Sequence, residues 1–302
     1  MSIRPDLLKK GDKIAIVATA RKISPQELDA SIKLFKSWQL EPLIGKSIGL
    51  EDNQFAGNDE ERAKDIQHFL NDKDIRAIFC ARGGYGTARI VDKLDFSTFT
   101  KYPKWIIGYS DPTVLLSHIF FNFKIETIHG IMPLNIQENS HNSKAIISLK
   151  QCLFEGKLLK NYSSNPMNRT GKSEGELVGG NLSVLYSLLG SQSFGDTKGN
   201  ILFIEDLDEY IYHIDRMMQA LRRAEKLKDL KGLIVGAFTD MHDNAIPFGK
   251  TSEEIIFEAV KDYDYPIAFN IPIGHIGQEN IACIVGRKTS LIIDNDKVII
   301  EQ

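Results

Sequence analysis

Short apolar runs alternate with amphipathic segments through the first half of the chain. The runs are rich in Ile, Val and Phe and have the length of buried strands, whereas the segments between them repeat at the helical period. Strands are predicted at residues 13–18, 75–80, 105–108 and 126–129, and helices at 25–38, 58–70 and 111–121. Residues 83–94 are expected to begin as a loop and become a helix. Strands separated by helices predict a parallel sheet covered on both faces, that is, a doubly wound α/β domain.

Polar residues become frequent between about 137 and 174, where Asn, Ser and Lys are common and one helix is predicted near 143–153. We therefore expect an N-terminal α/β domain at 1–136, a linker at 137–174 and a C-terminal β/α domain at 175–302. The last part mixes strands and helices and ends in short apolar runs that predict antiparallel hairpins.

Composition narrows the class of protein. A chain of 302 residues with 42% apolar and 25% charged residues is typical of a soluble globular protein of about two domains. The net charge of −3 gives no reason to expect nucleic acid or an anionic membrane as a partner. Three cysteines, far apart and without a C-x-x-C pair, predict a reducing, cytoplasmic location and neither a disulfide framework nor a cysteine metal site.

Ser110 lies at an abrupt junction between a predicted strand and a predicted helix, in the sequence IIGYSDPTVLL. A strand, a sharp turn and a helix within so few residues are typical of a nucleophile elbow, which exposes a serine at the end of a sheet. Pro112 suits the first helical turn, where no N–H is needed. The alternative is an ordinary helix N-cap, because Pro112 replaces the second glycine of G-x-S-x-G.

The glycine-rich segment ARGGYGTA follows the strand predicted at 75–80. It could bind a phosphate, although neither common phosphate-loop pattern is present. It could instead turn the amide of Gly83 or Gly84 toward Ser110 as half of an oxyanion hole, or be only a tight turn. Cys80, among apolar neighbours, is interpreted as a small buried residue rather than a nucleophile.

A carboxylate and a histidine in the second half could complete a catalytic triad with Ser110. Glu205 ends the apolar run ILFI, and His275 lies in a loop between Gly274 and Gly277. Their order, after the serine, is that of the α/β-hydrolases, and the site would lie between the two domains. The acids at 205–209 could instead cap a helix, bind a cation or be solvated, and His129 and His242 also stay open as candidates.

Several segments together resemble the serine LD-carboxypeptidase family, which includes the microcin C self-immunity peptidases. The similar segments are ARGGYGTARI at 81–90, IIGYSDPTVLL at 106–116, GELVGGNLSVL at 175–185, LFIEDLDEYIYHIDRMM at 202–218 and IPIGHIGQEN at 271–280. The resemblance implies Ser110 as nucleophile, Glu205 as acid, His275 as base, and the amides of Gly84 and Asp111 as oxyanion hole. It also implies a flavodoxin-like N-terminal domain, a smaller swivelling C-terminal domain, a homodimer, and no cofactor or metal.

The activity that the resemblance implies is hydrolysis of the LD-amide that releases terminal D-Ala from murein tetrapeptide during cell-wall recycling. Arg82 is a candidate for the terminal carboxylate of the substrate, and Tyr85, Asn181 and Tyr210 are weaker candidates for substrate contacts. One alternative is an immunity-type peptidase that cleaves a peptidyl- or aminoacyl-nucleotide amide. The other is a binding protein without catalytic activity that holds a small ligand between its domains.

Overall fold

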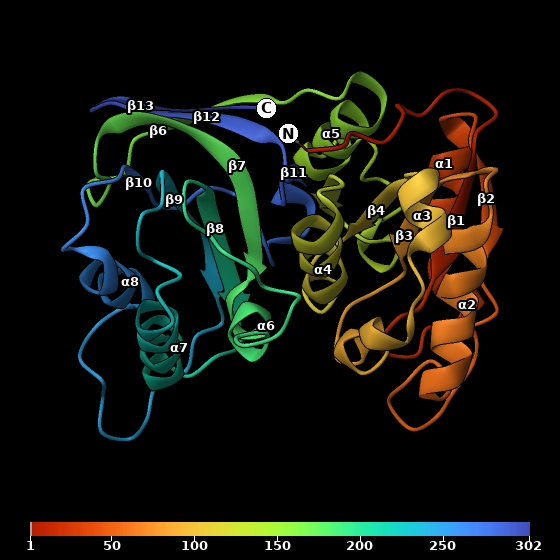
Figure 1. Ribbon diagram of the computed structural model, residues 1–302, viewed down its shortest axis with the longest axis horizontal. Helices are drawn as coiled ribbons and strands as arrows, with labels where there is room; N and C mark the ends of the chain where they lie inside the picture. The colour runs from red at the N-terminus through yellow and green to blue at the C-terminus, as the bar shows by residue number, and fades with distance from the viewer. Residues whose placement is uncertain (1) are drawn as a thin grey trace.

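The computed structural model describes residues 2–302, which form two β-sheets with helices packed around them (Figure 1). The strands are β1 (Lys13–Val17), β2 (Glu41–Ile44), β3 (Ile75–Cys80), β4 (Trp105–Gly108), β5 (Thr127–His129), β6 (Leu159–Ser163), β7 (Gly171–Asn181), β8 (Ile201–Leu207), β9 (Gly232–Thr239), β10 (Ile267–Ala268), β11 (Cys283–Val285), β12 (Lys288–Ile293) and β13 (Lys297–Glu301). The α-helices are α1 (Asp29–Ser37), α2 (Asp59–Asn71), α3 (Ser97–Lys101), α4 (Thr113–Phe123), α5 (Lys144–Lys150), α6 (Leu182–Ser187), α7 (Ile211–Arg223) and α8 (Ser252–Val260).

The first sheet has the strand order β11-β5-β4-β3-β1-β2. Strands β1 to β5 run parallel to one another, and β11 adds to the β5 edge in the antiparallel direction. From β2 to β5 the order 2-1-3-4-5 is that of flavodoxin-like domains, whose ligands bind where the order reverses, between β1 and β3. The structure therefore confirms the predicted doubly wound N-terminal fold.

Alternate residues of these strands face two different layers, as expected for a sheet buried on both sides. Ile78 and Ile106 belong to a core cluster that includes buried residues of α2 and α4, whereas Phe79 and Ile107 belong to a cluster with α1 and α5. The first cluster continues into the second sheet, because α4 lies between the sheets and contacts both β5 and β7 (Figure 1).

The second sheet has the order β10-β9-β8-β7-β12-β13-β6 and depends on the long, bent strand β7 (Figure 1). Residues 171–176 of β7 pair antiparallel with β12, and residues 177–181 pair parallel with β8. Gly179 lies in the parallel part with φ of +138°, and a β-carbon there would be 1.9 Å from the carbonyl oxygen of Phe203. Only glycine fits at this close approach of two strands.

The helix predicted within 83–94 is not formed. The segment contains only two short 3-10 turns, at Thr87–Arg89 and Val91–Lys93. The N–H groups of Gly86 and Thr87 donate to the carboxylate of Asp111, and Gly86 has φ of +154°. Gly86 therefore still belongs to the loop, and the residues after it form 3-10 turns instead of an α-helix.

A buried ion pair joins the two sheets where the chain passes from β11 to β12. Arg287 donates to both oxygens of Glu126, at 2.7 and 2.5 Å, and to the carbonyl oxygen of Gly156. Glu126 precedes β5 of the first sheet, and its side chain is 3% exposed. Removing one partner of such a pair leaves the other charge buried and unpaired.

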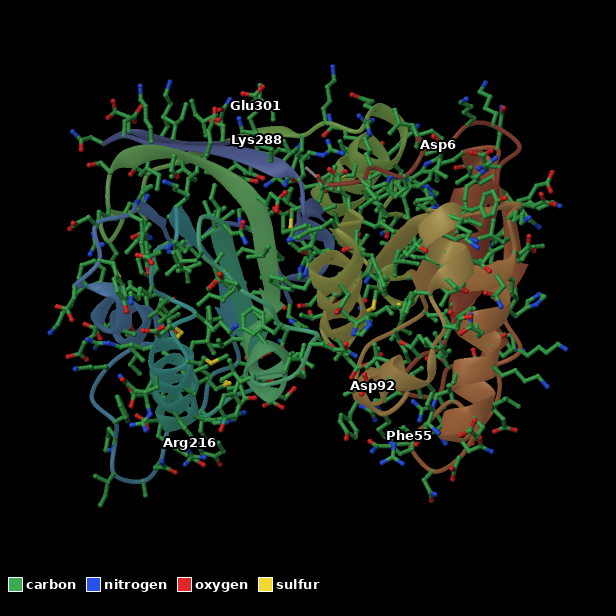
Figure 2. All side chains as sticks on the ribbon, in the orientation of Figure 1. Asp6, Phe55, Asp92, Arg216, Lys288 and Glu301 are labelled. Atoms are coloured by element: carbon green, nitrogen blue, oxygen red, sulfur yellow. The ribbon has the colours of Figure 1, made fainter. Side chains whose placement is uncertain are left out.

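We expect Arg287→Met to lower the free energy of unfolding by about 3–5 kcal/mol, because the buried Glu126 would lose its charged partner and keep, among residues 2–302, only the hydroxyl of Ser2. Lys288→Met is the matched control, since Lys288 lies at the surface of β12 and pairs with Glu174 in solvent (Figure 2). Its effect should stay within about 0.5 kcal/mol. Urea unfolding measures both variants, and equal losses of stability would contradict a special role for the buried pair.

Candidate active site

Ser110 stands in the tight turn between β4 and α4. Its backbone has φ of +65°, a left-handed conformation that costs a residue other than glycine about 1–2 kcal/mol. The Ser110 carbonyl oxygen accepts the N–H of Thr113 at 2.9 Å, which closes the turn. Gly108 is required below it, since a β-carbon there would lie 2.7 Å from Pro112 Cβ. Backbone strain of this kind, at the end of a central strand, is typical of a nucleophile elbow.

The glycine loop after β3 lies against Ser110. A β-carbon on Gly83 would be 3.0 Å from Ser110 Oγ, so the loop backbone passes directly beside the hydroxyl group. Gly84 has φ of +116°, and a β-carbon there would be 2.2 Å from Arg21 Cδ. Within residues 2–302, neither the Gly84 N–H nor the Asp111 N–H donates a hydrogen bond. Two free amides beside a serine can bind an oxyanion.

The carboxylate of Asp111 fixes the glycine loop to the serine turn. It accepts the N–H groups of Gly86 and Thr87, both at 3.0 Å, and the Thr87 hydroxyl at 2.5 Å. Burial raises the pKa of Asp111. The hydrogen bonds favour the charged form and lower the pKa, but burial has the larger effect. Arg62, also buried, donates to the carbonyl oxygen of Gly86 from the other side. The loop is thus held on both sides.

Glu205 and His275 are brought together by the second sheet. Glu205 is completely buried in β8, and its Oε2 accepts a hydrogen bond from His275 Nδ1 at 2.7 Å. Gly274, with φ of +115°, packs on the carboxylate so closely that a β-carbon would be 2.5 Å from Oε2. With Nδ1 bonded to the carboxylate, Nε2 is the nitrogen free to act as a base.

The imidazole of His275 lies next to the serine turn. Its ring centroid is 4.8 Å from that of Tyr109, the residue before Ser110. Between Ser110 and His275, both described by the structure, no direct hydrogen bond is present. Catalytic hydrogen bonds are often long without substrate and tighten when it binds. The structure thus joins two of the three predicted triad residues directly and brings the third close.

Charges around His275 favour its protonated form. Burial opposes the charge, but the hydrogen bond and charge of Glu205, with a further contribution from Asp206, outweigh burial and raise the pKa of His275. Asp206 itself is buried, and burial together with the neighbouring charge of Glu205 raises its pKa to about 7. The sequence alone did not distinguish Asp206 from Glu205. Both acids lie at buried positions of β8, which is buried on both faces.

His129, kept open as a candidate, lies buried near this pair. Burial lowers the pKa of His129 to about 4, so its ring is neutral at pH 7. Both of its ring nitrogens and Glu205 Oε1 are buried without a hydrogen-bond partner among residues 2–302. Its ring packs on Phe203 and Tyr109, with centroids 5.1 and 5.8 Å away. His129 is therefore a neutral, buried ring near Glu205.

The weaker candidates occupy different environments. Asn181 is buried, and its amide already bonds Asp206 and caps α6 through Val184, so a contact with substrate would require one of these bonds to break. Tyr85 and Tyr210 are exposed, and Tyr210 packs on Tyr212 and His242 at the start of α7. Arg82 is half-buried beside the glycine loop and donates to the carbonyl oxygen of Lys22.

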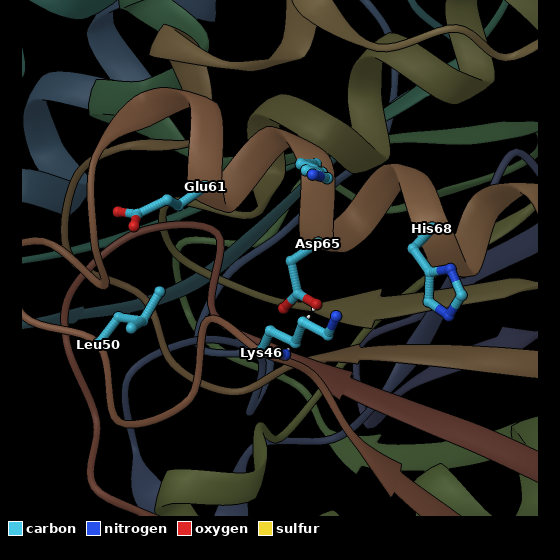
Figure 3. Close-up of a pocket in the computed structure, with 6 residues that line it drawn as sticks. Lys46, Leu50, Glu61, Asp65 and His68 are labelled. Carbon is cyan, nitrogen blue, oxygen red and sulfur yellow. Dashed lines mark hydrogen bonds between the residues drawn. The ribbon is translucent and has the colours of Figure 1, made fainter.

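A separate hollow lies over α2, away from these residues (Figure 3). It is lined by Lys46, Leu50, Glu61, Lys64, Asp65 and His68. Asp65 points toward the loop before it and accepts the N–H groups of Lys46 and Ser47, so its carboxylate is already satisfied (Figure 3). The carboxylate of Asp65 therefore serves the loop at 46–47 and is not left unpaired in the hollow. Within residues 2–302, no three His, Cys, Asp or Glu side chains are placed to share a metal ion.

The structure also bears on cysteine reactivity and on membrane-spanning helices. Burial raises the pKa of the Cys80 thiol to about 12, which keeps it protonated and unreactive. In the part of the chain that the structure describes, no helix has the length and apolar character needed to cross a bilayer.

Both halves of the chain match known protein families. Residues 14–130 match the family described as the LD-carboxypeptidase N-terminal domain, and residues 174–291 match the LD-carboxypeptidase C-terminal domain. A probable murein peptide carboxypeptidase of Bacillus subtilis is 34% identical, over 100% of this chain and 95% of that protein. The murein tetrapeptide carboxypeptidase of Pseudomonas aeruginosa is 27% identical, over 94% of each.

Solved structures share the fold over nearly the whole chain. The muramoyltetrapeptide carboxypeptidase of Oxalobacter formigenes superposes with a TM-score of 0.86 at 25% identity, covering 96% of this chain and 98% of that one. The microcin C7 self-immunity protein MccF superposes with a TM-score of 0.86 at 21% identity, covering 99% and 98%. The arrangement of two domains is therefore that of these proteins.

We expect Glu205→Gln to lower the pKa of His275, because burial then acts without the opposing carboxylate charge. Folding raises the pKa of His275, so the stability from its pairing with Glu205 is complete below the unfolded value of about 6.5. It is lost as pH rises through the folded pKa. The stability advantage of the wild type over Glu205→Gln should therefore shrink with rising pH.

NMR titration of the His275 ring and urea unfolding at several pH values measure the two effects. Glu209→Gln is the matched control, since Glu209 pairs with His213 instead. An unchanged His275 titration in Glu205→Gln would show that the carboxylate does not govern the imidazole.

Proposed function

Because the chain belongs to the LD-carboxypeptidase family, we propose that it is a serine peptidase that hydrolyses the amide between an L-centre and a terminal D-residue. The substrate would be a murein tetrapeptide and the released product D-alanine, in line with the names of its relatives. The observation that carries the proposal is the buried pair of Glu205 and His275, which lies beside the strained turn of Ser110.

In the proposed reaction, Ser110 Oγ attacks the scissile carbonyl carbon while His275 Nε2 takes the hydroxyl proton. The N–H groups of Gly84 and Asp111, which have no partner within residues 2–302, would stabilise the oxyanion. The C–N bond then breaks, and His275 gives its proton to the amine of the departing D-residue. A water molecule, activated by the same imidazole, hydrolyses the acyl-enzyme and restores the serine.

Glu205 would hold the ring of His275 in the tautomer that leaves Nε2 free and would stabilise the imidazolium form. The raised pKa of His275 is consistent with this task. The neutral His129 below the pair supports it further, because it adds no positive charge that would compete for the carboxylate.

We also propose that the C-terminal domain (175–302), which would carry acid and base, swivels slightly on the N-terminal domain (1–136) across the segment 137–174. A small closure would bring His275 Nε2 into hydrogen-bond reach of Ser110. Pairing of β11 with β5 and the ion pair of Glu126 with Arg287 would limit the movement. Three free, buried cysteines agree with a cytoplasmic role in cell-wall recycling, and the family resemblance supports a homodimer.

A second candidate function is cleavage of an aminoacyl-nucleotide amide, as in the microcin immunity peptidases. One observation favours it: the exposed rings of Tyr210, Tyr212 and His242 form a cluster near the carboxyl ends of β8 and β9. Aromatic rings of this kind can stack on a base. The tetrapeptide stays the first proposal, because relatives similar over nearly the whole chain bear murein carboxypeptidase names.

We expect Ser110→Ala and His275→Ala each to lower kcat for D-alanine release from an LD-tetrapeptide by about 10⁴–10⁶-fold, since members of a triad act as a unit. Glu205→Gln should lose somewhat less, about 10³–10⁴-fold, because it orients rather than transfers the proton. Detection of free D-alanine by a coupled oxidase assay measures all three.

Ser187→Ala is the matched control, since in the part of the chain that the structure describes the Ser187 hydroxyl bonds only the carbonyl oxygen of Val184, within its own helix. The same proteins are tested on the LL-peptide and on an aminoacyl sulfamoyl nucleoside. Cleavage of the nucleoside alone would favour the second candidate. Binding of the tetrapeptide without turnover, unchanged in Ser110→Ala, would point to a non-catalytic ligand-binding protein.

A further inference from the structure

A basic hollow of about 260 Å³ opens beside the glycine loop. Its walls come from the segment after β1, which carries Arg21 and Lys22, and from Arg82 after β3. These strands flank the point where the strand order of the first sheet reverses. Ligands of doubly wound domains bind outside the carboxyl ends of the strands at this point. The hollow thus has the position of a ligand subsite.

The positive charges of the hollow exceed the negative ones that are free to pair with them. Glu51 is paired with Lys22 at 2.9 Å, and Glu27 accepts the N–H and hydroxyl of Ser24 at 2.8 and 2.9 Å. Within residues 2–302, neither Arg21 nor Arg82 has a carboxylate at ion-pair distance. Two guanidinium groups therefore line the hollow without a direct ion pair, and Glu27 acts on Arg82 only from beyond ion-pair distance.

The hydrogen-bonding capacity of these arginines is largely unused. Arg82 donates one hydrogen bond, to the carbonyl oxygen of Lys22 at 3.0 Å, and its buried Nε has no partner among the residues that the structure describes. The Arg21 guanidinium donates none within the same residues. Burial, and then the charge of Arg21, lower the pKa of Arg82 although the charge of Glu27 raises it, and an anion between the two arginines would raise it further.

The hollow adjoins the backbone that would hold the oxyanion. The stem of Arg21 packs on Gly84, where a β-carbon would be 2.2 Å from Arg21 Cδ. In a substrate cleaved before its last residue, the free carboxylate lies one residue beyond the scissile carbonyl, a separation of about 3–4 Å. A carboxylate that close to the oxyanion site would meet the arginines, which bind carboxylates in a bidentate manner.

We propose that Arg21 and Arg82 together bind the free α-carboxylate of the terminal D-residue and so restrict the enzyme to the last peptide bond. This inference rests on the proposed function. It adds Arg21 to the site and assigns both arginines to recognition of the chain end rather than to the chemical step.

The test compares a tetrapeptide that ends in a free carboxylate with the same peptide ending in a carboxamide. For the wild type, kcat/KM should be about 10- to 100-fold higher for the acid, the usual effect of a charge-assisted hydrogen bond. Arg21→Ala and Arg82→Ala should lose most of this preference. The change should be mainly in KM for the acid, with kcat nearly unchanged, because ground state and transition state share the contact.

Arg76→Ala is the matched control, since Arg76 is an exposed arginine whose neighbour is Asp6, outside the hollow. It should keep the preference for the acid. If Arg82→Ala does not fold, Arg21→Ala decides, because its guanidinium bonds nothing within the described residues. Equal losses on acid and amide, or none, would overturn the inference while leaving the peptidase proposal intact. A wild type that releases D-alanine from neither peptide would overturn both.

Discussion

The burial of one carboxylate, that of Glu205, determines how the site is built. A completely buried charge is tolerated only when it is paired or hydrogen-bonded, and among residues 2–302 Glu205 has a single partner, His275 Nδ1. Glycine at position 274 lets the loop after β10 come close enough for that bond. The hydrogen bond that stabilises the buried carboxylate therefore also fixes the orientation of the imidazole. Its second nitrogen, Nε2, stays free to act as a base.

The two halves of the proposed site meet because the sheets share one core. Helix α4 begins at the serine turn and lies between the sheets, and the Thr113 hydroxyl at its start accepts the N–H of Asn181 at the end of β7. The ion pair of Glu126 with Arg287 is a second link between the two sheets. The contacts between the sheets thus hold the serine turn of one sheet next to the buried Glu205–His275 pair of the other.

Much of the fold followed from local patterns. The apolar runs of β1, β3 and β4 and the capping box of Asn58 with Glu61 are strong signals, and the structure has elements at those places. Edge strand β2 gave no signal, because its residues are mostly exposed. The helix expected after a loop within 83–94 was wrong, because the segment forms two short 3-10 turns. The Asp111 carboxylate, distant in sequence, accepts the amides at their start.

For the site, the sequence by itself determined the kinds of groups and their immediate backbone: a serine in a strand–turn–helix junction, an acid at a strand end, a histidine between glycines. Their catalytic roles stay a prediction. Only the tertiary structure decided that Glu205 and His275, 70 residues apart, share a hydrogen bond, and that Arg21 and Arg82 line one hollow. Local periodicity encodes which face of an element is buried. Which buried faces meet depends on the strand order and on the packing of the whole core.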